Sequence, residues 1–105
     1  MVERTSLDRV YAALSDGTRR RLLTQLGAGE ARITDLAAPL PMSFAAVARH
    51  VSVLERAGLV AREVRGREHW LSLRQGALDD AEGWIAEQTA FWQGRAEALE
   101  QQLRR

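Results

Sequence analysis

The stretch from Met42 to Leu73 constrains the fold most, because it combines a capped amphipathic helix with a short hairpin. The hydroxyl of Ser43 can accept a hydrogen bond from an unpaired N–H group of the first turn, so Ser43 is predicted to cap the helix. Apolar residues recur at helical spacing and predict one buried stripe, which consists of Phe44, Val47, Val51 and Leu54. Gly58 is expected to end the helix, where a left-handed backbone is common.

The opposite face of this helix combines small side chains with hydrogen-bond donors. It consists of Ala45, Ala46, Arg49, His50, Val53 and Arg56. Small residues let the helix backbone approach a surface closely, and Arg49 can donate two parallel hydrogen bonds to guanine or bind a phosphate. This face is typical of a helix that lies in the major groove of DNA.

A predicted hairpin follows the helix. Val60 to Val64 and His69 to Leu73 have strand-forming character, and Arg65-Gly66-Arg67 joins them. Gly66 can adopt the positive φ that a tight hairpin turn needs. Arg65 and Arg67 would then flank an exposed tip and reach the DNA backbone or minor groove. A helix followed by such a hairpin predicts a winged helix-turn-helix, a mainly α fold with one small β-hairpin.

Shorter helices are predicted upstream of this unit. Met1 to Ser6 is expected to be a lightly held arm, and the first helix follows with its apolar face formed by Leu7, Val10, Tyr11 and Leu14. Asp16 can cap a second helix that runs from Gly17 to about Leu26. Its basic run, Arg19 to Arg21, is compatible with simple solvation or with phosphate contact.

A third helix completes the helix-turn-helix pair. It is expected over residues 33–38 and is ended by Pro39 and Pro41, which also set the turn into the helix that follows Ser43.

Residues 75–105 are predicted to form one long helix. Apolar residues keep a helical spacing from Leu78 to Leu103, and Trp84 and Phe91 widen the apolar surface. The helix could fold back over its own domain, but we favour dimerisation, because Trp and Phe are common anchors in obligate interfaces. The predicted homodimer interface consists of Leu7, Tyr11, Trp84, Ile85, Phe91, Trp92 and Leu99.

Composition limits the class of protein. At 105 residues and 46% hydrophobic content, one domain with a single core is expected, with residues 7–74 as a DNA-binding core and 75–105 as a dimerisation helix. The sequence has no cysteine, which excludes disulfides and thiolate metal sites. No run approaches the length of a membrane helix and no signal peptide is apparent, so a cytoplasmic location is expected.

The net charge of +1 hides an uneven distribution of charge along the chain. All fifteen basic residues are arginine. Residues 43–74 carry six arginines against three glutamates, whereas residues 75–105 carry three arginines against six acidic residues. The positive excess therefore lies in the predicted recognition unit, as expected for a nucleic-acid binder, although a solvated surface would show the same asymmetry.

An enzyme is the hypothesis with the least support. The two histidines, His50 and His69, lie in the predicted recognition helix and wing, and a structural role is open for each. Ser43 has no histidine at a suggestive spacing, and no glycine-rich phosphate loop is present. No catalytic residue is predicted. The main alternative is a winged-helix module that binds protein rather than DNA, which would expose large apolar residues on the recognition helix.

Taken together, these segments resemble one known family. Residues 13–23, residues 42–60 and the hairpin Arg65-Gly66-Arg67-Glu68-His69-Trp70 are similar to the corresponding parts of ArsR-type winged-helix repressors. The resemblance is good over residues 7–74 and looser in the final helix. It implies a homodimeric bacterial transcription factor that binds double-stranded DNA. By the family's pattern, the residues that face the groove would be Ser43, Ala45, Ala46, Arg49 and His50, and Arg65 and Arg67 would lie on the wing.

Two departures from the family pattern bear on function. Gly17 stands where proline is common, which is expected to loosen the second helix. Metal-sensing members carry a cysteine pair on the third helix, where this chain has Arg32 and Thr34. Another metal site of the family uses Asp and His on the last helix, which here offers only carboxylates at Asp79, Asp80, Glu82 and Glu87. We therefore predict a member with no metal and no cofactor, whose small-molecule effector, if one exists, is not identified by the sequence.

Overall fold

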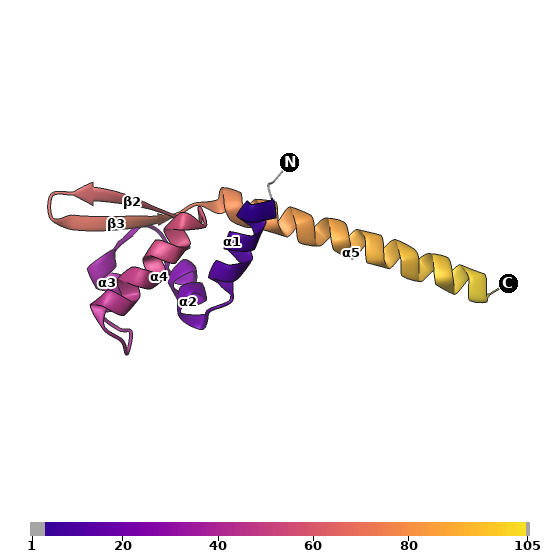
Figure 1. The fold of residues 1–105 in the computed structure, drawn as a ribbon, viewed down its shortest axis with the longest axis horizontal. Helices are drawn as coiled ribbons and strands as arrows, with labels where there is room; N and C mark the ends of the chain where they lie inside the picture. Colours follow the sequence, from indigo (N-terminus) through magenta and orange to yellow (C-terminus); the bar gives the residue numbers. More distant parts are fainter. Residues whose placement is uncertain (1–3, 105) are drawn as a thin grey trace.

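Five helices and a three-stranded antiparallel sheet make up residues 4–104, the part of the chain that the computed structural model describes (Figure 1). In chain order the elements are α1 (Arg4–Leu14), α2 (Gly17–Leu26), β1 (Ala31–Arg32), α3 (Ile33–Ala37), α4 (Phe44–Arg56), β2 (Val60–Arg65), β3 (Glu68–Leu73) and α5 (Gln75–Leu103). The predicted fold class, mainly α with a β-hairpin wing and a long C-terminal helix, is confirmed. The predicted arm was wrong in part, because Arg4 to Ser6 are helical; residues 1–3 lie outside the described residues.

The helices α1, α2, α3 and α4 and the base of the sheet share one apolar core. Its largest fully buried side chains are Leu22, Leu54, Leu59, Leu71, Val47 and Val51. Burial of each such side chain stabilises the fold by about 1.5–3 kcal/mol. In α2 the residues Leu22, Leu23 and Leu26 are buried; in α3 Ile33 and Leu36 are buried, whereas Ala37 is half-buried.

The end of α4 sets the direction of the wing. Gly58 has φ +76°, its N–H donates to the carbonyl of Glu55, and the N–H of Leu59 donates to the carbonyl of Leu54. This pattern is a Schellman motif, which needs a left-handed residue at the glycine position. The predicted stop at Gly58 is therefore confirmed, and the chain turns directly into β2.

The sheet has the order β1-β3-β2, so the hairpin carries a third strand that we did not predict. β1 has only two residues, which pair with Leu71 and Trp70 of β3. At the tip of the hairpin Arg65 pairs with Glu68, and Gly66 has φ +64°. A positive φ at the first central residue alone is typical of a type II′ turn, which accounts for the glycine there.

Most of α5 extends away from the domain (Figure 1). Near its start Ala81 is buried, and the Tyr11 hydroxyl donates a hydrogen bond to the Ala81 carbonyl at 3.2 Å. Beyond that point all large apolar side chains are exposed, and the molecule measures 69 × 29 × 23 Å. The alternative in which this helix folds back over its own domain is therefore wrong. None of the described helices is both long and apolar enough to span a membrane.

Candidate nucleic-acid interface

The N-terminus of α4 is fixed by the predicted cap. The Ser43 side chain accepts a hydrogen bond from the Ala46 N–H at 3.1 Å, and its backbone is extended at φ −66° and ψ 155°. An extended cap residue lets the helix begin abruptly at Phe44. Ser43 itself is exposed and keeps its hydroxyl proton for a further partner.

The predicted groove face of α4 is accessible. Ala45, Arg49 and Arg56 are exposed and Ala46 is half-buried. Among the described residues Arg49 forms no hydrogen bond and no ion pair through its side chain. Arg56 makes one long hydrogen bond from Nε to the Ser52 carbonyl, at 3.4 Å. Two guanidinium groups on this face are therefore available to an anionic partner.

Phe44 is the exception to the predicted stripe. Val47, Val51 and Leu54 are buried, but 52% of Phe44 is exposed, so its assignment to the core was wrong. Phe44 is the first residue of α4, a full turn ahead of the buried layer, and a side chain in a helix leans back toward the N-terminus. Its ring therefore stays outside the apolar core, on the same side of α4 as Val47.

His50 is held by α2 rather than free. Its Nδ1 lies 3.1 Å from Nη1 of Arg19 and 3.8 Å from an Asp16 carboxylate oxygen. Because a guanidinium can only donate, Nδ1 is the acceptor and the ring proton sits on Nε2. His50 therefore keeps one N–H donor, at Nε2, that these contacts do not use.

Arg19 also closes the end of α1, which the sequence did not reveal. Its Nε and Nη2 donate to the carbonyls of Ala13 and Ala12 at 2.8 and 3.1 Å. The Arg19 backbone N–H in turn donates to the Asp16 carboxylate and lowers the pKa of Asp16 below its usual value of 3.8. This predicted N-cap thus contributes stability above that pH and loses it as the pH falls through the lower folded-state pKa.

The two wing arginines differ in their surroundings. Arg65 donates to both carboxylate oxygens of Glu30 at 2.9 and 3.0 Å and to Glu63 at 3.0 Å, and its guanidinium lies 4.9 Å from the Trp70 ring centroid. These hydrogen bonds raise the pKa of Arg65 above its usual value. Arg67 is exposed and forms no ion pair among the described residues. Glu30 lies 35 residues from Arg65 in the chain, so no local sequence pattern indicates the pair.

Another arginine of the wing, Arg62, contacts α4. Arg62 in β2 donates from Nη2 to Glu55 of α4 at 2.6 Å, and its Nη1 lies 3.1 Å from Nδ1 of His69 in β3. Both members of the Arg62–Glu55 pair are largely shielded, with 25% and 30% of their side chains exposed. The structural role that we left open for His69 is therefore supported by its geometry. This pair joins the recognition helix directly to the wing.

The residues of the predicted homodimer interface lie on α1 and α5. Leu7 and Tyr11 are half-buried, and the Tyr11 and Trp84 rings meet edge to face at 6.1 Å. The remaining members are exposed: Trp84 46%, Ile85 49%, Phe91 57%, Trp92 66% and Leu99 57%. Within the described residues, no three His, Cys, Asp or Glu side chains lie close enough together to hold a metal ion.

Comparison with known proteins agrees with this geometry. Residues 14–63 match a family of helix-turn-helix domains. The HTH-type transcriptional regulator Rv2034 of Mycobacterium tuberculosis is 43% identical over 61 residues, which cover 58% of this chain and 57% of that protein. The transcriptional repressor SdpR of Bacillus subtilis is 28% identical over 79 residues, or 75% of this chain and 88% of that protein.

A solved structure extends the match over nearly the whole chain. The ArsR-like transcriptional regulator from Rhodococcus sp. RHA1 superposes with a TM-score of 0.81 at 35% sequence identity, covering 92% of each chain. The fold of this chain, with α4 followed by the β2–β3 hairpin, agrees with a relationship to that regulator. The chain therefore belongs to the ArsR family of winged helix-turn-helix transcriptional regulators.

Proposed function

We propose that the protein is a homodimeric repressor that binds a pseudo-palindromic DNA operator, with residues 7–74 as its DNA-binding core and 75–105 as its dimerisation helix. The observation that carries this proposal is the groove face of α4, where Arg49 is exposed and has no partner among the described residues. Small residues beside it, Ala45 and Ala46, leave room for base edges. Ser43, His50, Arg56, Arg65 and Arg67 complete the proposed contact set.

Dimerisation is proposed because of the unpartnered length of α5. Tyr11 of α1 contacts the start of this helix, and beyond that point the exposed aromatic and aliphatic side chains lie on one side of it with no other element of the described chain over them. A twofold axis through this helix would present two recognition helices to one face of DNA. Half-sites about 34–36 Å apart, one helical turn, are then expected.

Repression, rather than activation, is proposed in analogy with SdpR, which is described as a transcriptional repressor. Control of its own gene is the simplest form of such repression. We further propose that the protein does not respond to metals. Arg32 occupies one of the two positions that correspond to the cysteine pair of metal sensors, and it forms ion pairs with Asp35 and Glu68 at 2.9 and 3.3 Å.

A gel-shift titration against the DNA upstream of the protein's own gene tests the proposal. We expect a single retarded complex with two chains per site that resists excess random DNA and does not dissociate when zinc, cadmium or arsenite is added. Equal affinity for the upstream DNA and for random DNA would contradict operator recognition. Loss of the complex at metal concentrations equal to that of the protein would contradict the metal-independent class.

A further inference from the structure

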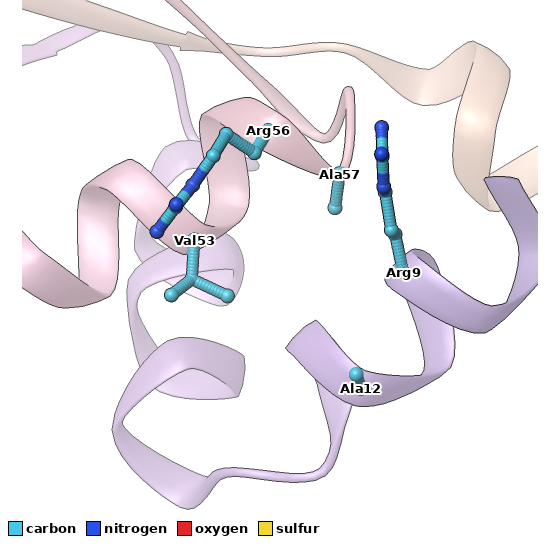
Figure 2. A pocket seen from close by; sticks show the side chains of 5 residues that line it. All are labelled: Arg9, Ala12, Val53, Arg56 and Ala57. Carbon is cyan, nitrogen blue, oxygen red and sulfur yellow. The ribbon is translucent and has the colours of Figure 1, made fainter. Parts of the chain in front are cut away.

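A cleft between α1 and α4 lies beside the proposed DNA-binding face. Its volume is about 380 Å³, and it is lined by Arg9, Ala12, Val53, Arg56 and Ala57. Figure 2 shows Arg9 on the α1 side and Arg56 on the α4 side of this cleft. Its volume falls within the range of about 300–1,000 Å³ that is usual for small-molecule sites.

The lining combines two positive charges with an apolar surface. Among the described residues neither Arg9 nor Arg56 forms an ion pair, although five other arginine–carboxylate contacts on this domain show that such pairs form readily. A guanidinium offers two parallel N–H donors that match a carboxylate. Between the arginines, Ala12, Val53 and Ala57 present methyl groups. An inorganic anion would leave the methyl groups uncovered, and a neutral apolar molecule would leave the arginines unpaired.

We propose that this cleft binds a small organic anion with one carboxylate and an apolar body, and that the bound anion weakens DNA binding. The link to DNA is Arg56, which with Val53 also lines a second hollow of about 640 Å³ on the exposed side of α4, together with Arg49, Ser52 and Glu55. A carboxylate on Arg56 would place a negative charge beside the groove face. This regulatory part rests on the proposed function, whereas ligand binding does not.

The cleft stays accessible in the proposed dimer. Tyr11 points toward α5, where it contacts Ala81 and Trp84, and Leu7 lines a hollow together with Ala77 and Asp80 of the same helix. Arg9 is two residues from each of them, which is about 200° around the helix. The face of α1 that lines the cleft is therefore not the face that meets α5.

Calorimetry without DNA tests the binding part. The probes are indole-3-acetate and octanoate, one flat and one flexible, with the neutral indole-3-acetamide and inorganic phosphate for comparison. We expect at least one carboxylate probe to bind. The amide should bind at least about tenfold more weakly because it lacks the charge that the arginines would pair with, and phosphate likewise because it lacks the apolar body. Failure of both carboxylate probes to bind, or equal binding of the amide or of phosphate, would overturn the proposal.

Substitutions in the cleft test whether the probe binds there. Arg9→Gln should weaken the carboxylate probe about tenfold, whereas Arg21→Gln, which removes an equal charge from an exposed position of α2, should not change it. Ala12→Leu should fill the cleft and abolish binding, and Ala12→Ser should retain it. Thermal melting checks that each variant is folded. Unchanged binding in Arg9→Gln and Ala12→Leu would show that the probe binds elsewhere and would overturn the assignment.

Gel shifts test the regulatory part. The probe should reduce the DNA affinity of the unmodified protein but not that of Arg9→Gln. Without the probe, the DNA affinity of Arg9→Gln should stay within about twofold, since Arg9 is an exposed charge outside the proposed contact set and salt screens its effect. If Arg9→Gln loses as much DNA affinity as Arg67→Ala, the cleft holds a DNA phosphate and the ligand proposal is wrong. If the protein binds the probe but no DNA, the proposed function and its regulation fail while the ligand site stands.

Discussion

Arg49 and Arg65 carry the same charge on the same proposed interface, yet their local contacts give them different tasks. The side chain of Arg49 has no partner among the described residues, so it loses no hydrogen bond when it meets a base edge. Arg65 is already bound by two carboxylates and lies over an aromatic ring. Charge alone therefore does not determine which arginines on this surface are able to read DNA.

Replacement of Arg49 tests its role as a reader. Arg49→Ala should cost about 1–3 kcal/mol on the operator and less on random DNA, because a bidentate contact to guanine depends on sequence. Arg21→Ala, which removes an exposed arginine of α2, serves as the matched charge control. Gel-shift titrations of both variants on both DNAs make the comparison. An equal loss on operator and random DNA would assign Arg49 to the phosphate backbone instead.

The wing should show the opposite behaviour. Arg67→Ala should weaken operator and random DNA evenly and flatten the salt dependence by about one unit of slope, as expected when one phosphate contact is lost. Arg65→Ala should have the smaller effect, because Glu30 and Glu63 already neutralise its charge. Glu30→Gln should raise DNA affinity by releasing Arg65. Titrations at several salt concentrations measure these slopes, and a larger effect of Arg65→Ala than of Arg67→Ala would contradict this ranking.

Between elements, the contact of Glu55 in α4 with Arg62 in β2 joins recognition helix and wing. Removal of an acidic residue from a DNA-binding surface should raise affinity by charge alone. Glu55→Gln is nevertheless expected to lower it, because the wing would lose this contact with α4. Gel-shift titration measures the sign of the change.

The control for this prediction is Glu82→Gln, which removes an exposed carboxylate on α5. It should leave affinity unchanged or raise it slightly. A higher affinity in Glu55→Gln would show that Glu55 acts only through its charge and that the pair does not position the wing.

Elements whose residues cooperate locally could be predicted from the sequence. The cap at Ser43, the stop at Gly58 and the turn at Gly66 each depend on a few neighbouring residues, and each lies where it was expected. What was missed depends on residues far apart in the chain. β1 is only two residues long and exists because β3 lies beside it, and Phe44 is exposed because no other element covers the first turn of α4.

The same reason limits prediction of the candidate site. The composition of the groove face follows from helical spacing, but which arginines are engaged does not. Arg19 meets His50 across 31 residues of sequence, and Arg65 meets Glu30 across 35. Only the folded chain distinguishes a free guanidinium from a paired one.

The whole molecule is more extended than a compact domain of the same length. Its radius of gyration is 18.4 Å, against about 13 Å for a compact domain of this length. The excess comes from α5, whose outer part contacts no other described element and exposes Phe91, Trp92, Leu99 and Leu103. An isolated helix with such a surface is costly in water, so a second copy of the chain is the partner that we expect to cover it.

Polar substitution of the aromatic residues tests this expectation. The triple variant Trp84→Gln, Phe91→Gln, Trp92→Gln should raise the dimer dissociation constant at least about a hundredfold, because burial of each aromatic side chain contributes about 1.5–3 kcal/mol. Light scattering at micromolar concentration should find a dimer before the change and a monomer after it. Because Trp84 also contacts Tyr11 within the chain, the double variant Phe91→Gln, Trp92→Gln separates dimer loss from damage to the domain.

The matched control is the triple variant Glu82→Gln, Glu87→Gln, Glu97→Gln, which alters three exposed acidic residues of the same helix. It should remain dimeric, since it removes no apolar surface. The monomeric variants should also lose operator affinity steeply while they keep weak binding to random DNA, because one recognition helix contacts only one half-site. A dimer that survives all three aromatic changes would place the interface elsewhere, and an unmodified protein that is monomeric at micromolar concentration would contradict the two-half-site operator itself.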